Sequence, residues 1–465
     1  MDRRGTSPVG AALVLLGIGA GAALWTTGPA GLQDPWVPTP FLRGYAIAWV
    51  CYVLAAVALT RARSRPRWTL VWIVVITVGL RLIALERTAL LSTDAYRYLW
   101  DGRVANTGVN PFVYPPDAPE LRELRDANWR LISFKQVPTI YPPAAQLLFR
   151  GLARVRESDT RAFHWTFAAC DVGCVLLLIA LLRRTGRAPE HVIWYAWCPL
   201  PITEMAAGAH ADAMALLLFL GACCACVGAG ASSCPTGRGA LGSGLALAGA
   251  VMAKGYAVLA VPALVRRGGW WVAGSFAAGC ALLLMPYASA GDKLFGGLSA
   301  YMGKWESNAS IFILADRLLE GVTERHFAVT RELSEAAVLL CVVILTWRLK
   351  PGPESLLRAV FLGFGAQLML GAPTLPWYAI WVAPALCWWT VPGLVLFTLT
   401  ISLQYYARWL WPGDVEKAFA LLWAGYVPMY VLLMGQAALW MAKRRREERE
   451  SDDPSADRRA ALLPR

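Results

Sequence analysis

The chain has 465 residues, of which 57% are hydrophobic and 16% are charged, and its formal net charge is +13. A soluble domain carries about 25% charged residues, so this composition excludes a soluble enzyme. The basic residues lie in short breaks between apolar blocks, as the positive-inside rule expects, and form no basic stripe with aromatics between them. We therefore predict an integral membrane protein that binds the lipid bilayer and no nucleic acid.

The apolar residues form continuous blocks rather than alternating patterns, which predicts transmembrane helices. A helix needs about 20 apolar residues to cross the hydrocarbon, and only helices or closed barrels satisfy their backbone groups in lipid. Asp2-Arg3-Arg4 precedes the first block, and we expect an uncleaved span there rather than a signal peptide, because further blocks follow at once. The predicted fold class is an all-α polytopic membrane protein of about 12–14 transmembrane helices. The blocks cover residues 9–27, 43–60, 68–86, 162–182, 189–200, 211–230, 239–253, 255–265, 269–287, 334–348, 357–371, 378–391, 393–407 and 417–441.

Lys and Arg predict the orientation of the bundle. Counting spans from a cytoplasmic N-terminus places two long hydrophilic segments, about 87–160 and 288–333, outside. We expect residues 1–442 to form the transmembrane domain and residues 443–465 a disordered, charged cytoplasmic tail. The protein is expected in the plasma (inner) membrane with both termini in the cytoplasm. The strongly basic breaks, which all fall on the cytoplasmic side in this count, are 61–67, 183–187, 266–267, 348–358 and 443–449.

The chain has eleven cysteines, and all but Cys234 lie in apolar blocks. Buried cysteine behaves as a small hydrophobic residue. The long hydrophilic segments contain no cysteine. We therefore predict no structural disulfide and no zinc site.

The outer segment 87–160 holds the first candidate for chemistry. Ser92 or Thr93 can cap a helix that starts near Asp94, and in that helix Arg97 and Asp101 share a face with Asp94. A carboxylate here can accept a proton from an acceptor hydroxyl. The alternative for Asp94 alone is a solvated helix cap. Two further short amphipathic pieces, 119–129 and 144–152, predict interfacial helices rather than a free tether.

Further polar clusters interrupt the apolar chain at the same face. Glu204, His210 and Asp212 lie around a Pro-rich break between two short blocks, a pattern typical of half-helices that build a site, or of a loop in water. Lys254 lies between two blocks, where it can pair with a phosphate or snorkel to lipid headgroups. The remaining clusters, 301–308 and 373–378, are rich in aromatics, which singly indicate only an interfacial belt. Because the clusters share one face, together they predict a site for a lipid-linked phosphate and a sugar. Asn308 begins a glycosylation sequon, which we discount because so short a pattern is common by chance.

These motifs resemble the GT-C superfamily of membrane glycosyltransferases, in particular the polyprenol-phosphate-mannose-dependent mannosyltransferases and their bacterial relatives. The resemblance covers residues 85–390. It is carried by Asp94-Ala95-Tyr96-Arg97-Tyr98-Leu99-Trp100-Asp101-Gly102, Gly108-Val109-Asn110-Pro111, Thr139-Ile140-Tyr141-Pro142-Pro143-Ala144-Ala145-Gln146, Glu204 with His210-Ala211-Asp212, Lys254, and Pro376-Trp377-Tyr378.

The resemblance implies a GT-C bundle with interfacial helices in its outer loops and a catalytic loop at 87–160. It implies transfer of a sugar, mannose by analogy, from a polyprenyl-phosphate donor to an acceptor hydroxyl on a glycan, lipid or protein, with inversion. Asp94 would be the general base, and Arg97 and Lys254 would bind the donor phosphate. The residues expected to bind substrate are Tyr96, Asp101, Tyr141, Glu204, His210, Asp212, Trp305, Asn308, Trp377 and Tyr378.

No second acid stands beside Asp94, so we expect no required cofactor, and a divalent metal is the less favoured alternative. Two other functions stay open at this stage. A transporter or flippase for a lipid-linked sugar would need charged groups at the bilayer midplane, whereas here they crowd one face. A ligase that moves a whole glycan from a diphosphate lipid would share the bundle and the site.

Overall fold

A computed structural model describes residues 8–26, 38–62, 65–86, 92–228, 237–411 and 413–451. Within these ranges all regular elements are helical, apart from one isolated bridge between Ser307 and Pro373. The predicted all-α class is therefore confirmed. The ten described cysteines are free thiols, and Cys234 lies outside the described residues.

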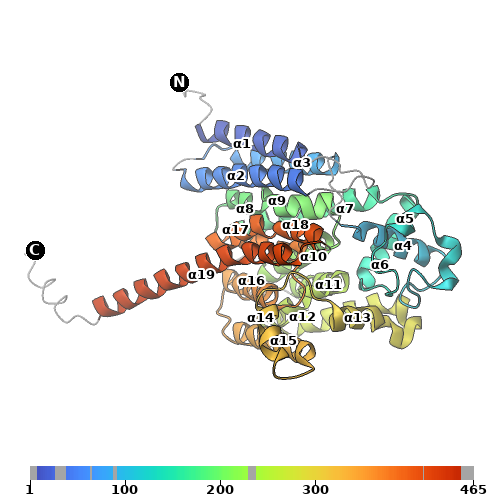
Figure 1. Ribbon diagram of the computed structural model, residues 1–465. Helices are drawn as coiled ribbons and strands as arrows, with labels where there is room; N and C mark the ends of the chain where they lie inside the picture. Colours follow the sequence, from blue (N-terminus) through green and yellow to red (C-terminus); the bar gives the residue numbers. More distant parts are fainter. Residues whose placement is uncertain are drawn as a thin grey trace, which may run out of the picture.

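Three apolar helices form the first layer of the bundle (Figure 1). They are α1 (Pro8–Trp25), α2 (Thr39–Arg61) and α3 (Thr69–Glu86), and α1 contacts both of the others. Because these helices are apolar around much of their circumference, many of their large apolar side chains are exposed, Leu15 and Ile47 among them. Such exposure is expected where the surrounding solvent is hydrocarbon.

The segment after α3 forms a compact lobe at one end of the bundle (Figure 1). It contains α4 (Asp94–Asn106), η1 (Pro119–Leu124), α5 (Ala127–Arg130) and α6 (Pro143–Val155). The predicted helices at 94 and 144–152 are thus present, and the predicted helix 119–129 is divided into two short turns. α4 packs closely on α6 because Gly102 has no side chain: a Cβ there would lie 2.2 Å from the Phe149 carbonyl oxygen.

The middle of the bundle contains helices that break. After α7 (Arg161–Arg184) the chain runs through η2 (Pro189–Val192), α8 (Ile193–Ala196), α9 (Pro199–Pro201) and η3 (Ile202–Ala207), the last of which is a π-helix. Prolines lack the N–H that a continuous helix uses, so the 189–200 block is not one straight span. The helix 199–207 meets α10 (Asp212–Val227) at an angle of 119°, which agrees with the predicted Pro-rich break.

The C-terminal half continues the same pattern of long and broken helices. α11 (Gly237–Ala253) packs on α12 (Val261–Leu284), and α19 (Val415–Ser451) is the longest. Residues 443–451 of the predicted disordered tail are helical here, since Arg and Glu favour helices; residues 452–465 lie outside the described part. The other elements are η4 (Gly255–Ala260), η5 (Met285–Phe295), α13 (Gly296–Lys304), α14 (Ile311–Glu320), α15 (His326–Trp347), α16 (Pro353–Leu370), η6 (Pro376–Trp381), η7 (Ala383–Cys387), α17 (Pro392–Thr400) and α18 (Leu403–Leu410).

Five helical stretches of the described chain are long and apolar enough to cross a membrane, and a sixth is added if the bent pair forms one span. This number is below the predicted 12–14 because several apolar blocks, such as 378–391, are 3₁₀ turns or short helices. The five are Thr39–Arg61, Thr69–Glu86, Arg161–Arg184, Gly255–Gly303 and Val415–Arg445.

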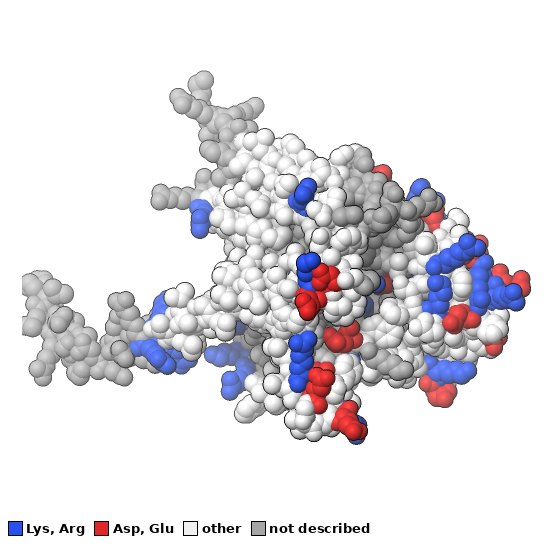
Figure 2. Space-filling view, viewed as in Figure 1, with Lys and Arg blue, Asp and Glu red and all other residues white. Residues whose placement is uncertain are grey.

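Charged side chains gather at two ends of the molecule, and a further group of both signs lies in the lower middle of the view, where α14 and α15 lie (Figure 2). Lys and Arg, with acids among them, cover the lobe of α4–α6, and more Lys and Arg lie toward the end of α19. Few charges lie on the visible surface of α1, α2 and α17 between them. Inside the bundle, the Arg81 guanidinium pairs with Asp171 at 2.8 Å, and Tyr195 donates to the same carboxylate, which joins α3, α7 and α8. A buried charge is tolerable only with such partners.

Candidate active site

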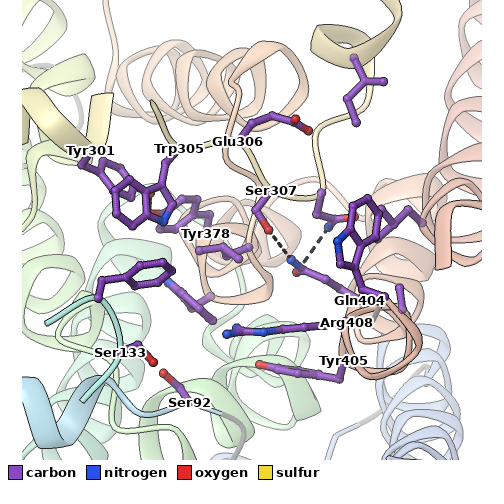
Figure 3. A pocket seen from close by; sticks show the side chains of 18 of the residues that line it. Ser92, Ser133, Tyr301, Trp305, Glu306, Ser307, Tyr378, Gln404, Tyr405 and Arg408 are labelled. Carbon is purple, nitrogen blue, oxygen red and sulfur yellow. Dashed lines mark hydrogen bonds between the residues drawn. The ribbon is translucent and has the colours of Figure 1, made fainter. Parts of the chain in front are cut away.

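One large cavity opens where the lobe of α4–α6 meets the C-terminal half of the chain. Its volume is about 1280 Å³, above the range of roughly 300–1,000 Å³ typical of a site for one small ligand. The cavity thus exceeds the volume that one small ligand needs. Its walls come from the start of α4, the segment 133–141, the loop between α13 and α14, η6 and α18 (Figure 3).

Asp94 is the first residue of α4 and lines the cavity. The backbone N–H of Asp94 donates to Ser92 Oγ at 3.2 Å, while Thr93 makes no capping hydrogen bond through its side chain. The Tyr141 hydroxyl donates to Asp94 Oδ2 at 3.2 Å. Burial, and next the Asp94 carboxylate, raise the pKa of Tyr141 well above its usual value, so the phenol stays protonated and acts as the donor. The second oxygen, Asp94 Oδ1, has no hydrogen-bond partner among the described residues.

Arg97 lines the same cavity, but its charge is already paired. Its Nε donates to Asp101 Oδ1 at 2.8 Å, four residues further along α4. Gln146 Nε2 donates to the other Asp101 oxygen at 3.1 Å and to Thr139 at 2.8 Å. Asp101 does not line the cavity, so it holds Arg97 in place rather than facing a ligand. Arg97 Nη2 is buried without a hydrogen-bond partner in the described chain.

Lys254 enters the cavity from the junction of α11 and η4. Its Nζ lies 3.0 Å from Asp212 Oδ2, and the other oxygen of Asp212 accepts from Trp381 Nε1 at 2.9 Å. The ammonium also faces the rings of Tyr378, at 5.3 Å, and Tyr141, at 5.8 Å. Tyr141 therefore bonds to Asp94 through its hydroxyl and presents its ring to Lys254, which brings the predicted base and a predicted phosphate ligand into one site.

Glu204 is buried in the π-helix, behind the cavity wall. The Tyr405 hydroxyl donates to its carboxylate, at 2.8 and 2.9 Å from the two oxygens. A buried carboxylate needs such donors because burial without them is costly. Tyr405 does line the cavity, so Glu204 fixes a residue of the wall.

His210 lies in the break after the π-helix and is fully buried. Its ring stacks on Trp377 with a centroid distance of 4.1 Å, and its Nδ1 lies 2.8 Å from the Glu204 carbonyl oxygen. Ala209 beside it has a φ of 51°, a strained value for a residue with a side chain. Strain of this kind is found where a site requires a particular geometry.

The three predicted substrate ligands of this region thus stand one layer behind the cavity. Each holds a side chain that lines it: Glu204 holds Tyr405, His210 holds Trp377, and Asp212 holds Lys254.

The predicted aromatic residues Trp305, Trp377 and Tyr378 all line the cavity. Tyr378 shares a hydroxyl hydrogen bond of 2.5 Å with Tyr301, and Trp305 packs against the Phe134 ring at 4.6 Å. Flat aromatic faces of this kind suit the stacking of a sugar ring or a polyprenyl chain.

Two residues predicted to bind substrate, Asn308 and Tyr96, do not present free side chains to the cavity. Asn308 lines the cavity with little exposed surface, and its Nδ2 donates to the Thr374 backbone carbonyl at 2.8 Å. The backbone carbonyl of Asn308 accepts from the Tyr426 hydroxyl at 2.6 Å. These bonds hold the 307–310 loop and leave the amide engaged. Tyr96 is outside the cavity and packs in a cluster with Trp100 and other apolar side chains of the lobe.

The sequence interpretation missed the contribution of α18. Gln404, Tyr405 and Arg408 all line the cavity (Figure 3), although the end of block 393–407 was expected to be only a span. The available signal was a Gln, a Tyr and an Arg at a spacing that places them on one helical face. Among the described residues, no three His, Cys, Asp or Glu side chains converge as metal ligands would.

The fold and the cavity define the class: a polytopic membrane protein with one large polar site at the end of its bundle. The particular family follows from sequence comparison. Residues 8–269 match the model of the alpha-(1->6)-mannopyranosyltransferase family, N-terminal domain, and this is more than half of the chain, so the chain belongs to that family. No curated protein matches it. Membership supports glycosyltransferase activity with mannose as the transferred sugar, and the resemblance to GT-C mannosyltransferases is confirmed.

Proposed function

We propose that the protein transfers mannose from a polyprenyl-phosphate donor to an acceptor hydroxyl, with Asp94 as general base. One observation carries this proposal: the Asp94 carboxylate and the Lys254 ammonium line one cavity on either side of Tyr141. Glycosyl transfer to a hydroxyl needs a base for the nucleophile and positive charge for the leaving phosphate.

The geometry suggests how the proton moves. The Tyr141 hydroxyl already donates a hydrogen bond to Asp94 Oδ2, so Oδ1 accepts the proton of the acceptor hydroxyl. The hydroxyl oxygen forms a bond to the anomeric carbon as the bond from that carbon to the phosphate oxygen breaks. The electron pair leaves with the lipid phosphate, which the cavity cations stabilise. Attack from the side opposite the phosphate inverts the anomeric centre.

The family description suggests the product. An α-(1→6) linkage formed with inversion requires a β-linked mannosyl phosphate donor and a primary 6-hydroxyl on the acceptor. We propose this pair of substrates, with the acceptor hydroxyl carried by a glycan, a lipid or a protein.

We also propose that the site faces the outside of the plasma membrane. The lobe of α4–α6 and α13 lie together at one end of the bundle, and the basic end of α19 lies toward the other (Figures 1 and 2). The positive-inside rule assigns that basic end to the cytoplasm.

Purified wild type and Asp94→Asn would be assayed in detergent for transfer of radiolabel from polyprenyl-phosphate-mannose to membrane lipid acceptors. The variant should lose at least about 100-fold in rate, the size expected for a general base. Asp117→Asn is the matched control, because Asp117 is exposed in the same lobe and outside the cavity. Equal rates for all three proteins would reduce Asp94 to a helix cap.

If wild type consumes no donor but vesicles containing it move the donor across the bilayer, the protein is a transporter. If only a diphosphate-linked glycan is consumed, it is a ligase.

A further inference from the structure

α18 carries an arginine whose guanidinium lies in the cavity and has no hydrogen-bond or ion-pair partner among the described residues. In the view of Figure 3, the Arg408 side chain extends from α18 beside Tyr405 toward Ser92 and Ser133, the side of the cavity where Asp94 begins α4. In the described part of the chain, Arg408 makes no ion pair and no hydrogen bond. Its charge is therefore available to a ligand.

The two cations that the sequence analysis assigned to the donor phosphate, unlike Arg408, each have an acidic partner. Arg97 is paired with Asp101 at 2.8 Å and Lys254 with Asp212 at 3.0 Å. Each pair has little net charge, so its attraction for an added phosphate is smaller than that of a free guanidinium at the same distance. A phosphate in this cavity would therefore be held more strongly by a further cation that has no acid beside it.

Arg317, on α14, is the other cavity arginine without an ion pair among the described residues, and its surroundings make it a poorer choice. Its guanidinium lies 4.4 Å from the centroid of the Phe419 ring. Four acids line the part of the cavity around Arg317, on α14, on the loop before it and at the start of α19. Their negative charges disfavour a phosphate there. The four are Glu306, Asp316, Glu320 and Glu416.

The helix that carries Arg408 is anchored on both sides. Gln404, one turn before Arg408, donates to Ser307 Oγ at 3.1 Å, and Tyr405 donates to the buried Glu204 carboxylate. Residues three and four apart share a helical face, so these anchors fix the face from which Arg408 projects. A cation on a backbone held in this way binds with less ordering cost than one on a loose loop.

We propose that Arg408 is the principal ligand of the lipid phosphate and stabilises it as it leaves. This inference rests on the proposed function, because it assigns the donor phosphate of that reaction to a residue. The departing phosphate gains one negative charge when its bond to the sugar breaks. A guanidinium offers two parallel N–H donors to such an oxyanion, which an ammonium cannot do.

The test measures binding rather than turnover, so that it stands apart from catalysis. Wild type, Arg408→Gln, Arg408→Lys and Arg317→Gln, each in lipid nanodiscs, would be titrated with a polyprenyl phosphate and with the polyprenol of the same chain length. Arg122→Gln is the matched control: Arg122 is an exposed arginine of the lobe, outside the cavity, and its loss changes the net charge equally.

We expect wild type and the control to prefer the phosphate over the alcohol. Arg408→Gln should bind the phosphate about 10- to 100-fold more weakly with unchanged binding of the alcohol, and Arg408→Lys should lie between them. An unchanged preference in Arg408→Gln, or a loss in Arg317→Gln instead, overturns the assignment and leaves the proposed function standing. A wild type without preference for the phosphate overturns both.

Discussion

Asp212 has both carboxylate oxygens engaged, one by the Lys254 ammonium and one by the Trp381 indole N–H. It is fully buried and does not line the cavity, whereas the lysine that it holds does. The same arrangement recurs at Glu204, which holds Tyr405, and at Asp101, which holds Arg97. Acids that lie behind the wall thus set the positions of the side chains that line the cavity. Removing such an acid leaves the partner charge buried and unpaired, which is costly.

Asp212→Asn should therefore lower kcat/KM for the donor about 10- to 100-fold. The amide oxygen still accepts from Trp381, and the amide NH2 then replaces Oδ2, so the change removes both the charge and the acceptor opposite Lys254. Steady-state kinetics with varied donor concentration measure this effect, and thermal unfolding of the same samples separates it from a loss of fold. Asp212→Glu should recover part of the activity. Full activity in Asp212→Asn would show that Lys254 needs no carboxylate to keep its place.

At the level of elements, the site depends on two close contacts between backbones. α4 approaches α6 at Gly102, and α13 approaches the segment before Tyr141 at Gly297, where a Cβ would lie 2.3 Å from the Thr139 carbonyl oxygen. The first contact positions Asp94 and Arg97 relative to Gln146, and the second positions Tyr301 relative to Tyr141. Glycine is the residue that allows a backbone to come this near.

Gly102→Ala should destabilise the protein by about 1–3 kcal/mol, because the methyl group cannot be accommodated against the Phe149 carbonyl without moving α6. Thermal unfolding in detergent measures this, and transfer activity should fall with it as Asp94 and Tyr141 separate. Gly151→Ala on α6 is the control, since nothing lies within 4 Å of its Cβ position. An alanine at that helical site should be neutral or stabilising by up to about 1 kcal/mol. Equal unfolding temperatures for the two variants would contradict the close-contact argument.

Over the whole molecule, charged side chains gather toward two ends of an apolar bundle, besides a group of both signs in the middle of the view (Figure 2). The lobe that carries Asp94 is at one of them, and the basic end of α19 lies toward the other. If the bundle spans the plasma membrane as proposed, the two ends contact different aqueous compartments. The site would then meet substrates on the outer side only.

A membrane-impermeant maleimide added to intact cells should label Asp117→Cys, in the lobe, and leave Arg445→Cys, near the end of α19, unlabelled. Both positions are exposed in the described chain, so accessibility alone does not distinguish them. Wild type gives the background from the natural cysteines. Labelling of Arg445→Cys after cell lysis confirms that the thiol is reactive. The reverse pattern in intact cells would place the site in the cytoplasm.

Hydropathy and local motifs determined the class of this protein without any structure. The apolar blocks specified an all-helical membrane bundle because lipid permits few other solutions, and the Asp94 helix was predictable because its start signal lies within a few residues. The number of spans could not be predicted from the sequence, because hydropathy does not distinguish a buried 3₁₀ turn, such as Pro376–Trp381, from part of a transmembrane helix.

Only the tertiary structure decided which residues line the cavity. The pairing of Glu204 with Tyr405 joins residues 201 positions apart, and that of His210 with Trp377 joins two broken helices. Their place in apolar sequence marked Glu204 and His210 as unusual, but the same pattern fits a ligand and a support behind it, and Tyr405 was not among the predicted residues. Packing alone separated these roles and brought Arg408 into the cavity, because contacts between distant helices depend on the whole bundle and not on local sequence.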